Sequence, residues 1–440
     1  MKYFGTDGFR GRANESLTAI HAFRVGRFLG RHFARGGRPR IAVGKDTRLS
    51  SYAFEYALAS GAAASGADVY LLHVTTTPSV SYVVRTEGFD CGVMISASHN
   101  VFSDNGLKLF GGDGEKMDEG TLALVEDYLD GGTLPLATGA DIGRTVDYVA
   151  GRNRYLAYLL SLPRTSFRGL RVGLDCANGS AWALAKTVFD ALGAQVWCIG
   201  TTPDGTNINA QCGSTCPARL CELVRMYALD VGFAFDGDAD RCIAVDERGE
   251  VVDGDGILFV CAKDMRERGE DAGGGVVTTV DSNGALARAL ERMGIRCVRT
   301  QVGDKFVSEE MARRGALLGG EPSGHIVFRK YATTGDGILT AIRLSEVVLE
   351  RKCPLSFLTR GYVPLPQRRR NVPVRGGADI VGSERVRAAI AQAEQGGVRM
   401  VVRPSGTEPL VRILAEGEEG AAEEAVRLVE RAVLACGEAL

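Results

Sequence analysis

The sequence lacks any run of about 18 consecutive apolar residues, roughly the length that a membrane-spanning helix needs. Its first segment, Met1–Asp7, also lacks the apolar core of a signal peptide, so we expect neither export nor a membrane partner. An excess of charge of one sign is missing too, because 52 Lys and Arg face 54 Asp and Glu for a net charge of -2. This balance gives no electrostatic reason to expect nucleic acid as a partner.

Cysteine and histidine are not arranged as metal ligands. The 11 Cys are an odd number and scattered, and several, such as Cys91, lie in apolar runs where a thiol acts as a small hydrophobe. The close set Cys212, Cys216 and Cys221 has no His nearby, which argues against a zinc site. Such cysteine usage fits a reducing compartment, so we expect a cytoplasmic protein.

A strand–helix–strand pattern occurs three times in the chain. Its copies span Arg40–His73, Leu170–Ile199 and Gly275–Thr300. Because 440 residues exceed one ordinary core and the copies lie at domain-sized intervals, they are interpreted as domains rather than solenoid repeats. We therefore expect an α/β fold with three similar α/β/α domains, whose mostly parallel mixed sheets are covered on both faces.

Each copy is followed by another apolar run that ends in a polar loop. The loops are Ser96–Asn100, Asp236–Arg241 and Gly320–His325. Ligands of open α/β sheets bind beyond the carboxyl ends of the strands, and a scaffold alone gives no reason for three such different polar loops. If the domains face one another, the loops converge on a central cleft.

The pattern changes after Pro364–Pro366. The basic run Arg368–Arg370 and the pair Gly376–Gly377 predict a linker. The shorter segment beyond it predicts a smaller α+β domain that carries Arg403–Glu408. The expected domains are residues 1–150, 151–247, 248–362 and 363–440.

Two loops of the first domain carry groups suited to an anion or to nucleophilic chemistry. Ser98 lies at a strand end where a nucleophile could lie, with His99 beside it and Lys108 shortly after. The segment Phe4–Gly11 holds Arg10 among three glycines and an Asp, which suits a loop that presents Arg10 to an anion. In isolation, an ordinary polar turn explains each segment at least as well.

The second polar loop places three carboxylates, Asp236, Asp238 and Asp240, at alternate positions. In an extended loop alternate residues point the same way, so all three can face one cation. Oxygen-only ligands indicate Mg²⁺ rather than zinc, and no closing Glu follows at the spacing of an EF-hand. The alternative, a solvated acidic turn, fits poorly because the apolar run Val231–Phe235 draws the loop into the interior.

The last two loops suit a phosphorylated sugar. The segment Arg403–Thr407 combines an Arg, two hydroxyls and a Gly that lets backbone N–H groups approach a phosphate. Glu321 and Ser323 offer a carboxylate and a hydroxyl for the hydroxyls of a polyol, and His325 can donate or accept a proton. A surface turn and a capped turn are the alternatives for these two loops.

Taken together, the loops indicate phosphoryl transfer on a sugar phosphate. A metal beside a serine, a phosphate cradle and a hydroxyl-binding loop supply the charge neutralisation and positioning that a metaphosphate-like transition state needs. A serine hydroxyl can carry the phosphoryl group between two positions of one substrate. The alternative from another class is a sugar-phosphate-binding protein without turnover, and the presence of Ser98, the three Asp and both His argues against it.

The sequence resembles the α-D-phosphohexomutase superfamily over essentially its whole length, and its phosphoglucosamine mutase branch most closely. Five motifs in fixed order carry the resemblance: Phe4–Gly11, Ser96–Asn100, Asp236–Arg241, Gly319–His325 and Arg403–Pro409. Stretches that resemble the glucosamine branch are Pro203–Asn209, Cys212–Thr215, Val302–Asp304, Thr333–Leu339 and Gly406.

Three residues depart from the usual patterns. Val101 stands where the superfamily usually has Pro, whereas Lys305 and Pro322 stand where the glucosamine branch usually has Arg and Gln. These departures leave phosphoglucomutase or phosphomannomutase activity as the alternative.

The resemblance implies an isomerase, an intramolecular phosphotransferase that interconverts glucosamine 6-phosphate and glucosamine 1-phosphate and feeds UDP-N-acetylglucosamine and cell-wall precursor synthesis. Four domains would surround a central cleft that takes a small hexosamine phosphate. One Mg²⁺ per chain and a sugar 1,6-bisphosphate, as activator and intermediate, are implied as cofactors. The oligomeric state is open, with a homodimer as one option.

The resemblance also implies a role for each site residue. Ser98 would be a phosphoserine that binds Mg²⁺ together with Asp236, Asp238 and Asp240. Sugar hydroxyls would be held by Glu321 and Ser323, and the non-reacting phosphate by Arg403, Ser405, Gly406 and Thr407. The electrostatic and acid–base set would be Arg10, His99, Lys108, Arg241 and His325.

Overall fold

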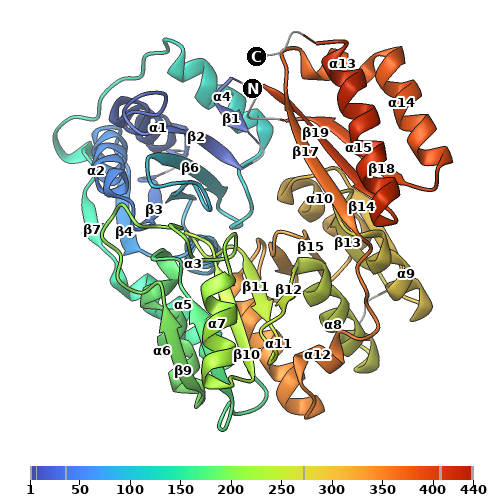
Figure 1. Cartoon of the computed structure of the whole chain (residues 1–440). Helices are drawn as coiled ribbons and strands as arrows, with labels where there is room; N and C mark the ends of the chain where they lie inside the picture. The colour runs from blue at the N-terminus through green and yellow to red at the C-terminus, as the bar shows by residue number, and fades with distance from the viewer. Residues whose placement is uncertain (1, 6, 35–36, 271–272, 406–408, 438–440) are drawn as a thin grey trace.

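The computed structural model of the protein describes residues 2–5, 7–34, 37–270, 273–405 and 409–437. Figure 1 shows the chain passing through successive lobes, from the blue N-terminal part through green and yellow to the red C-terminal part. Four β-sheets form within the described residues, one after another along the sequence. The predicted α/β class is therefore confirmed.

The first sheet is mixed, with strand order β1-β2-β6-β5-β3-β4-β7. Its strands are β1 Phe4–Gly5, β2 Gly8–Arg12, β3 Arg40–Lys45, β4 Asp68–Val74, β5 Cys91–Ile95, β6 Asp104–Gly111 and β7 Thr145–Asp147. The helices of this part are α1 Ala19–His32, α2 Leu49–Ala64, α3 Thr77–Glu87, α4 Glu119–Leu129 and the 3-10 helix Gly139–Asp141. Strands β5, β3, β4 and β7 run parallel, and β6 returns antiparallel beside β5.

The second sheet has the order β12-β11-β10-β8-β9. Its strands are β8 Arg171–Asp175, β9 Gln195–Ile199, β10 Val231–Phe235, β11 Cys242–Val245 and β12 Val251–Val252. The helices are α5 Val149–Ser161, the 3-10 helix Ser180–Ala183, α6 Ala185–Leu192 and α7 Ala218–Tyr227.

The third sheet has the order β14-β13-β15-β16. Its strands are β13 Val276–Thr279, β14 Cys297–Thr300, β15 Leu318–Gly320 and β16 Ile326–Phe328. The helices are α8 Gly254–Glu267, α9 Gly284–Arg292, α10 Asp304–Arg314, α11 Gly337–Arg351 and α12 Leu355–Leu358.

These three sheets share one four-strand unit. The orders β4-β3-β5-β6, β9-β8-β10-β11 and β14-β13-β15-β16 are equivalent, with three parallel strands and a final antiparallel one. Strands β5 and β10 are buried at every residue, as expected of strands covered on both faces. In each unit the last two strands are joined by one of the polar loops, at Ser96–Asn100, Asp236–Arg241 and Glu321–His325.

The C-terminal part is a smaller α+β unit with an antiparallel sheet, in the order β17-β19-β18. Its elements are β17 Gln367–Pro373, α13 Gly377–Gly382, α14 Glu384–Gln395, β18 Arg399–Pro404, β19 Leu410–Glu416 and α15 Glu419–Leu434. The linker predicted at Arg368–Arg370 is wrong, because these residues lie in β17. Val372 is the buried residue of this strand, and Arg368 and Arg370 on the same face form ion pairs with Glu419 and Glu423 of α15.

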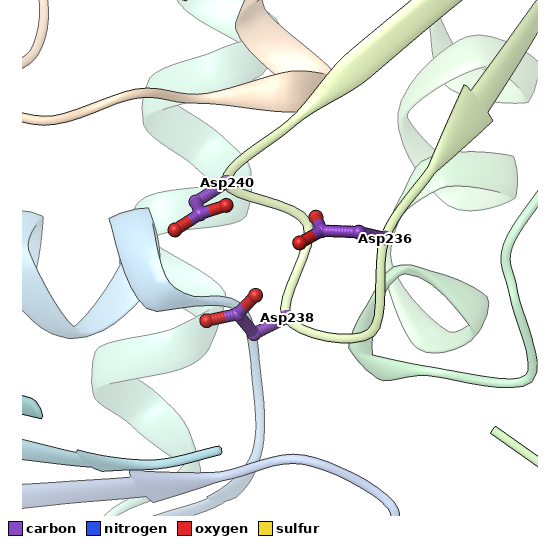
Figure 2. A group of neighbouring side chains, drawn as sticks. All are labelled: Asp236, Asp238 and Asp240. Atoms are coloured by element: carbon purple, nitrogen blue, oxygen red, sulfur yellow. The ribbon is translucent and has the colours of Figure 1, made fainter. Parts of the chain in front are cut away.

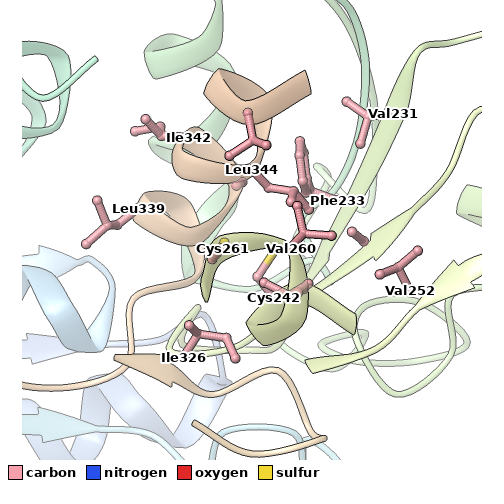
Figure 3. Packing of buried hydrophobic residues seen from close by; sticks show 14 of the residues in the cluster. Val231, Phe233, Cys242, Val252, Val260, Cys261, Ile326, Leu339, Ile342 and Leu344 are labelled. Atoms are coloured by element: carbon pink, nitrogen blue, oxygen red, sulfur yellow. The ribbon is translucent and has the colours of Figure 1, made fainter. Parts of the chain in front are cut away.

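The second and third units share one hydrophobic core. Figure 3 shows Phe233 of β10 and Cys242 of β11 packed with Val260 of α8 and Leu339 and Ile342 of α11. Helix α11 contacts both β10 and β11, so it covers the preceding sheet as well as its own. Among the helices of the described ranges, none combines the length and apolar character that a membrane crossing needs.

Candidate active site

The serine loop joins β5 to β6, where Ser98 is fully buried. Its φ angle of 54° is left-handed, a conformation that costs a non-glycine residue about 1 kcal/mol or more. The amide of Ser98 donates to Ser96 Oγ at 2.9 Å, and Ser96 Oγ in turn donates to Asp46 Oδ2 at 2.7 Å. Local hydrogen bonds therefore hold the serine in a backbone conformation that would otherwise be disfavoured.

The hydroxyl of Ser98 lies between a carboxylate and an imidazole. Its Oγ donates to Asp236 Oδ2 at 2.5 Å and lies 3.3 Å from His99 Nδ1. Burial, followed by the positive charges of Arg241 and Arg10, lowers the pKa of His99 to about 3. His99 is consequently neutral at pH 7 and can exchange a proton with a neighbouring oxygen.

The predicted acidic triplet forms in the loop between β10 and β11. Asp236, Asp238 and Asp240 are each at most 3% exposed, and one oxygen from each lies within 4.8 Å of the others. Figure 2 shows the three carboxylates turned toward a common space. Burial and the neighbouring charges of Asp240 and Asp238 raise the pKa of Asp236 well above its ordinary value. Three carboxylates crowded in the interior need a compensating cation.

The donor set fits a divalent metal ion. The Oδ1 atoms of Asp238 and Asp240 are buried and have no hydrogen-bond partner among the described residues. Their Oδ2 atoms face Lys108 of β6, whose Nζ lies 2.7 Å from Asp238 and 2.9 Å from Asp240. Burial lowers the pKa of Lys108, but Asp238, Asp240 and Asp7 outweigh it and hold the pKa well above its ordinary value. One face of the triplet thus has a fixed positive charge, and two oxygens that accept no hydrogen bond from the described residues remain for a hard cation.

The loop between β15 and β16 supplies Glu321 and Ser323. The Oε1 atom of Glu321 accepts from the Gly303 amide at 3.1 Å, and burial raises the pKa of this carboxyl group. The hydroxyl of Ser323 is buried without a hydrogen-bond partner in the described structure. An unpaired buried hydroxyl is a group that a ligand can satisfy.

His325 closes the same loop and is 3% exposed. Burial lowers its pKa, but Asp240, Asp304 and Glu321 raise it to about 9. The Gly335 amide donates to Nε2 at 3.1 Å, which instead requires a neutral ring with its proton on Nδ1. The hydrogen bond is the better guide, because a cation at Asp240 would remove much of the negative charge that raises this pKa.

The C-terminal unit contributes Arg403 and Ser405. Arg403 Nη2 donates to Asp281 Oδ2 of the third unit at 3.0 Å, and Ser405 Oγ is buried without a partner within the described ranges. Gly406 and Thr407, predicted to bind the same phosphate, lie outside the described residues.

One cavity connects the predicted groups from all four parts of the chain. Its volume is about 910 Å³, and its wall includes Arg10, Arg241, Glu321, His325, Arg403 and Ser405. Asp240 belongs to the wall as well, whereas Ser98 does not belong to it and is bonded to the same acidic loop through Asp236. Two of the three repeated loops therefore share the cavity wall, and the serine loop contacts one of them, the loop Asp236–Arg241.

Four domain families match the chain in sequence. They are described as "Phosphoglucomutase/phosphomannomutase, alpha/beta/alpha domain I" over residues 1–134, the corresponding domain II over 153–249, domain III over 253–364, and the C-terminal domain over 369–433. The order of the matches follows the order of the four sheets.

Full-length relatives are closely similar. A phosphoglucosamine mutase of Lachnospira eligens is 56% identical over 98% of this chain and 97% of its own length, and one of Lachnoclostridium phytofermentans is 52% identical over 94% of each. The chain belongs to the phosphoglucosamine mutase family of phosphohexomutases. It is accordingly an isomerase of the phosphotransferring kind.

Solved phosphohexomutases share the fold of this family member. A phosphoglucomutase/phosphomannomutase family protein from Burkholderia thailandensis superposes with a TM-score of 0.82 at 25% identity, covering 99% of this chain and 97% of the other. An N-acetylphosphoglucosamine mutase from Aspergillus fumigatus, solved with GlcNAc-6P and magnesium, gives a TM-score of 0.70 at 18% identity, covering 99% and 96%.

Sequence reasoning missed several residues that surround this phosphohexomutase site. Asp7 pairs with Lys108 at 3.2 Å, with Lys116 at 2.6 Å and with Arg10, although only Arg10 was singled out in that motif. The lone carboxylate among the glycines of Phe4–Gly11 was the available signal. Asn209 also contacts the serine loop, and its position in the stretch Pro203–Asn209 was the only sign of it.

Proposed function

We propose that the chain interconverts glucosamine 6-phosphate and glucosamine 1-phosphate through phospho-Ser98 and a bisphosphorylated sugar. The observation that carries this proposal is the 2.5 Å contact of Ser98 Oγ with Asp236 in a buried carboxylate triplet. The identity to enzymes named phosphoglucosamine mutase supports the amino-sugar substrate and a place in amino-sugar and cell-wall precursor synthesis.

In the proposed reaction the phosphoryl group moves from Ser98 Oγ to the 1- or 6-hydroxyl of the sugar. The bond between phosphorus and Oγ breaks as the new P–O bond forms, and the hydroxyl proton leaves to a base. His99 is neutral and 3.3 Å from Oγ, and His325 reaches the cavity, so both can move protons there. Lys108, Arg10 and Arg241 neutralise charge around the transferring group.

The acidic triplet is proposed to hold one Mg²⁺ together with the seryl phosphate. Asp236, Asp238 and Asp240 would be its protein ligands, and the Oδ1 atoms of Asp238 and Asp240, which accept no hydrogen bond from the described residues, support this assignment. When bound, the ion would polarise the phosphoryl oxygens and offset the negative charge that accumulates in the transition state.

The remaining groups are proposed to orient the sugar phosphate. Glu321 and Ser323 would bind sugar hydroxyls, and the unpaired Ser323 hydroxyl supports this role. The non-reacting phosphate would lie against the groups of the C-terminal loop, namely Arg403, Ser405, Gly406 and Thr407. A sugar 1,6-bisphosphate would be both activator and intermediate, and it would turn around within the cavity before returning a phosphoryl group to Ser98.

We further propose the domain limits 1–150, 151–247, 248–362 and 363–440, which assign the four sheets to separate units except for β12 of the second sheet, which lies beyond residue 247. Helix α5 crosses the first limit and the β11–β12 hairpin crosses the second, so the first three units are joined by continuous structure. A cytoplasmic location is proposed because all 11 cysteines are free thiols.

A homodimer is proposed as the oligomeric state. Helix α2 exposes Leu49, Tyr52 and Tyr56, which share one face of the helix at helical spacing. Such an apolar surface is typical of contacts between chains.

The test is a side-by-side assay of glucosamine, glucose and mannose 6-phosphates with the matching bisphosphate as activator. We expect the glucosamine substrate to give the highest kcat/KM, and intact mass to show a gain of about 80 Da that Ser98→Ala lacks. Pro322, between the two proposed sugar-binding residues, is the observation that favours the second candidate, a phosphoglucomutase or phosphomannomutase. A preference for glucose or mannose phosphate would establish that candidate instead.

A further inference from the structure

Two backbone carbonyls of the serine loop each accept hydrogen bonds from two different side chains, Arg48 and Asn209. The carbonyl oxygen of Ser98 accepts from Arg48 Nη2 at 3.0 Å and from Asn209 Nδ2 at 2.9 Å. The carbonyl of Asn100 accepts from the same two nitrogens, at 2.9 Å and 3.1 Å. The loop that carries the nucleophile is thus held by its main chain, independently of the serine hydroxyl.

Arg48 is the donor that belongs to the first unit. It is fully buried, and its guanidinium also donates to Asp46 Oδ2 at 2.7 Å, to the carbonyl of Asp104 at 3.0 Å and to the carbonyl of Val101. All five N–H donors of the guanidinium are therefore used. A buried, fully bonded Arg is a structural anchor, so its removal would disturb the fold as well as the loop.

Asn209 is the donor that belongs to the second unit. It ends the stretch Pro203–Asn209, and its own amide donates to the carbonyl of Ala177 at 2.8 Å. Its φ angle of 58° is left-handed, so its backbone is held in a conformation chosen by few residues other than Gly, Asn and Asp. Its side chain then bridges to the first unit and bonds only backbone oxygens of the serine loop among the contacts described.

The loop Asp236–Arg241 also packs against the Ser98 carbonyl, through Gly237. A Cβ atom on Gly237 would lie 2.5 Å from the Ser98 carbonyl oxygen and 3.1 Å from Asn209 Nδ2. Gly237 lies between Asp236 and Asp238, so three loops from two units pack around one carbonyl group. Any shift of the serine loop there changes the distance from Ser98 Oγ to the triplet.

We propose that Asn209 is a positioning residue that fixes Ser98 against the acidic triplet across the junction of the first two units. The inference rests on the proposed phosphoserine function. Asn209 does not belong to the wall of the substrate cavity, so its effect would fall on the transfer step rather than on substrate binding. Misplacement of a reacting group by about 1 Å can lower a rate by roughly 100-fold.

The test compares Asn209→Ala and Asn209→Asp with Asn207→Ala as the matched control. Asn207 lies in the same loop, but its amide side chain bonds Thr202 and Asp204 within that loop. We expect Asn209→Ala to lower kcat roughly 10- to 100-fold while KM stays within about twofold. Asn209→Asp keeps the shape but replaces the donor by a carboxylate, so we expect a loss of kcat at least as large.

A second readout needs no turnover. Hydrogen exchange of the Ser98 and Asn100 amides should become faster in both Asn209 variants and stay unchanged in Asn207→Ala, with unfolding midpoints equal among the three. Equal kcat and equal loop exchange in Asn209→Ala and Asn207→Ala would overturn the inference, as would a loss of kcat that follows a lowered unfolding midpoint. If the unmutated chain shows no turnover, the proposed function fails, whereas faster loop exchange in the Asn209 variants alone still supports the positioning contact.

Discussion

The two ends of the site, the serine end and the phosphate end, are built in different ways. At the serine end, Ser98, Asp236 and Asp238 are at most 1% exposed, and bonds from two units hold their loops. At the phosphate end, the side chain of Arg403 is 26% exposed and forms an ion pair with Asp281 across a unit boundary. Groups that stabilise a transition state must be fixed beforehand, whereas a group that holds a reorienting bisphosphate must let it go.

The burial of Ser98 also indicates that one end of the site is fixed and that the other must move. Ser98 is fully buried and bonded to Asp236 of the acidic loop, and a phosphoryl group there needs more room than a hydroxyl. In the proposed cycle the intermediate also turns around within the cavity. The C-terminal unit begins with β17 at Gln367 and contributes Arg403 and Ser405 to the cavity wall. A movement of this unit would open the cavity while the serine end stays rigid.

The largest predicted difference in kinetic effect is between Ser98→Ala at the serine end and Ser405→Ala at the phosphate end, each of which removes one hydroxyl. Ser98→Ala deletes the proposed phosphoryl carrier, so we expect kcat to fall by roughly 10⁴-fold or more. Ser405→Ala deletes a hydroxyl that would add one hydrogen bond to a phosphate, so we expect KM to rise roughly tenfold with kcat nearly unchanged. Steady-state assays with bisphosphate present measure both; similar losses in the two variants would contradict the comparison.

Metal removal should act on the serine end alone. Chelation at pH 7 should lower turnover by roughly 10³-fold, and Mg²⁺ should restore it, because the triplet would otherwise present uncompensated charge to a phosphate. Asp238→Asn should lose activity that added Mg²⁺ does not restore, since Asp238 Oδ1 is one of the unpaired oxygens. Full activity in the presence of a strong chelator would refute the metal assignment.

Truncation of the phosphate-binding arginine should mainly affect substrate affinity. Arg403→Ala removes a planar fork suited to a phosphate, so we expect KM to rise roughly 10- to 100-fold and kcat to fall less. Arg427→Ala is the matched control, because Arg427 is an exposed arginine of α15 that pairs with Glu423 in the same unit. A fall in kcat with unchanged KM would place Arg403 in the chemical step instead.

Much of this contrast could be predicted from the sequence. The repeated unit and its polar loops were visible because buried parallel strands are continuous apolar runs, and Asp236, Asp238 and Asp240 stood out beside Val231–Phe235. Strand β17 was missed because Arg368 and Arg370 occupy alternate positions with the buried Val372, on the face where α15 supplies Glu419 and Glu423 as their partners. Basic residues at these positions hide the apolar alternation that is typical of a strand.

The contacts that fix the serine end could not be read from the sequence. Arg48 and Asn209 donate to backbone carbonyls of residues far away in the sequence. Because every residue has a backbone carbonyl, the sequence does not indicate which one accepts these bonds. Asp7 was likewise invisible as the shared partner of Lys108 and Lys116, because its role depends on two strands and a loop meeting in space.

The smallest predicted effect concerns how the C-terminal unit docks on the third. Glu416 accepts from the Gly284 amide at 3.0 Å and pairs with Arg399 at 2.9 Å, and Arg399 in turn donates to the carbonyls of Val280 and Ser282 at 2.8 Å each. Burial raises the pKa of Glu416, but these donors outweigh it and hold the pKa below its ordinary value of 4.5.

A carboxylate with a depressed pKa stabilises the folded state above its unfolded pKa and loses that contribution as the pH falls through the folded value. Glu416→Gln should therefore cost about 1–3 kcal/mol of docking stability at pH 7 and progressively less below pH 4.5, as measured by the unfolding midpoint over that range. Glu419→Gln, which alters an exposed pair of the same unit, should have a much smaller effect. A penalty for Glu416→Gln that does not change with pH would show that the charge of this residue is not what holds the movable end of the cavity.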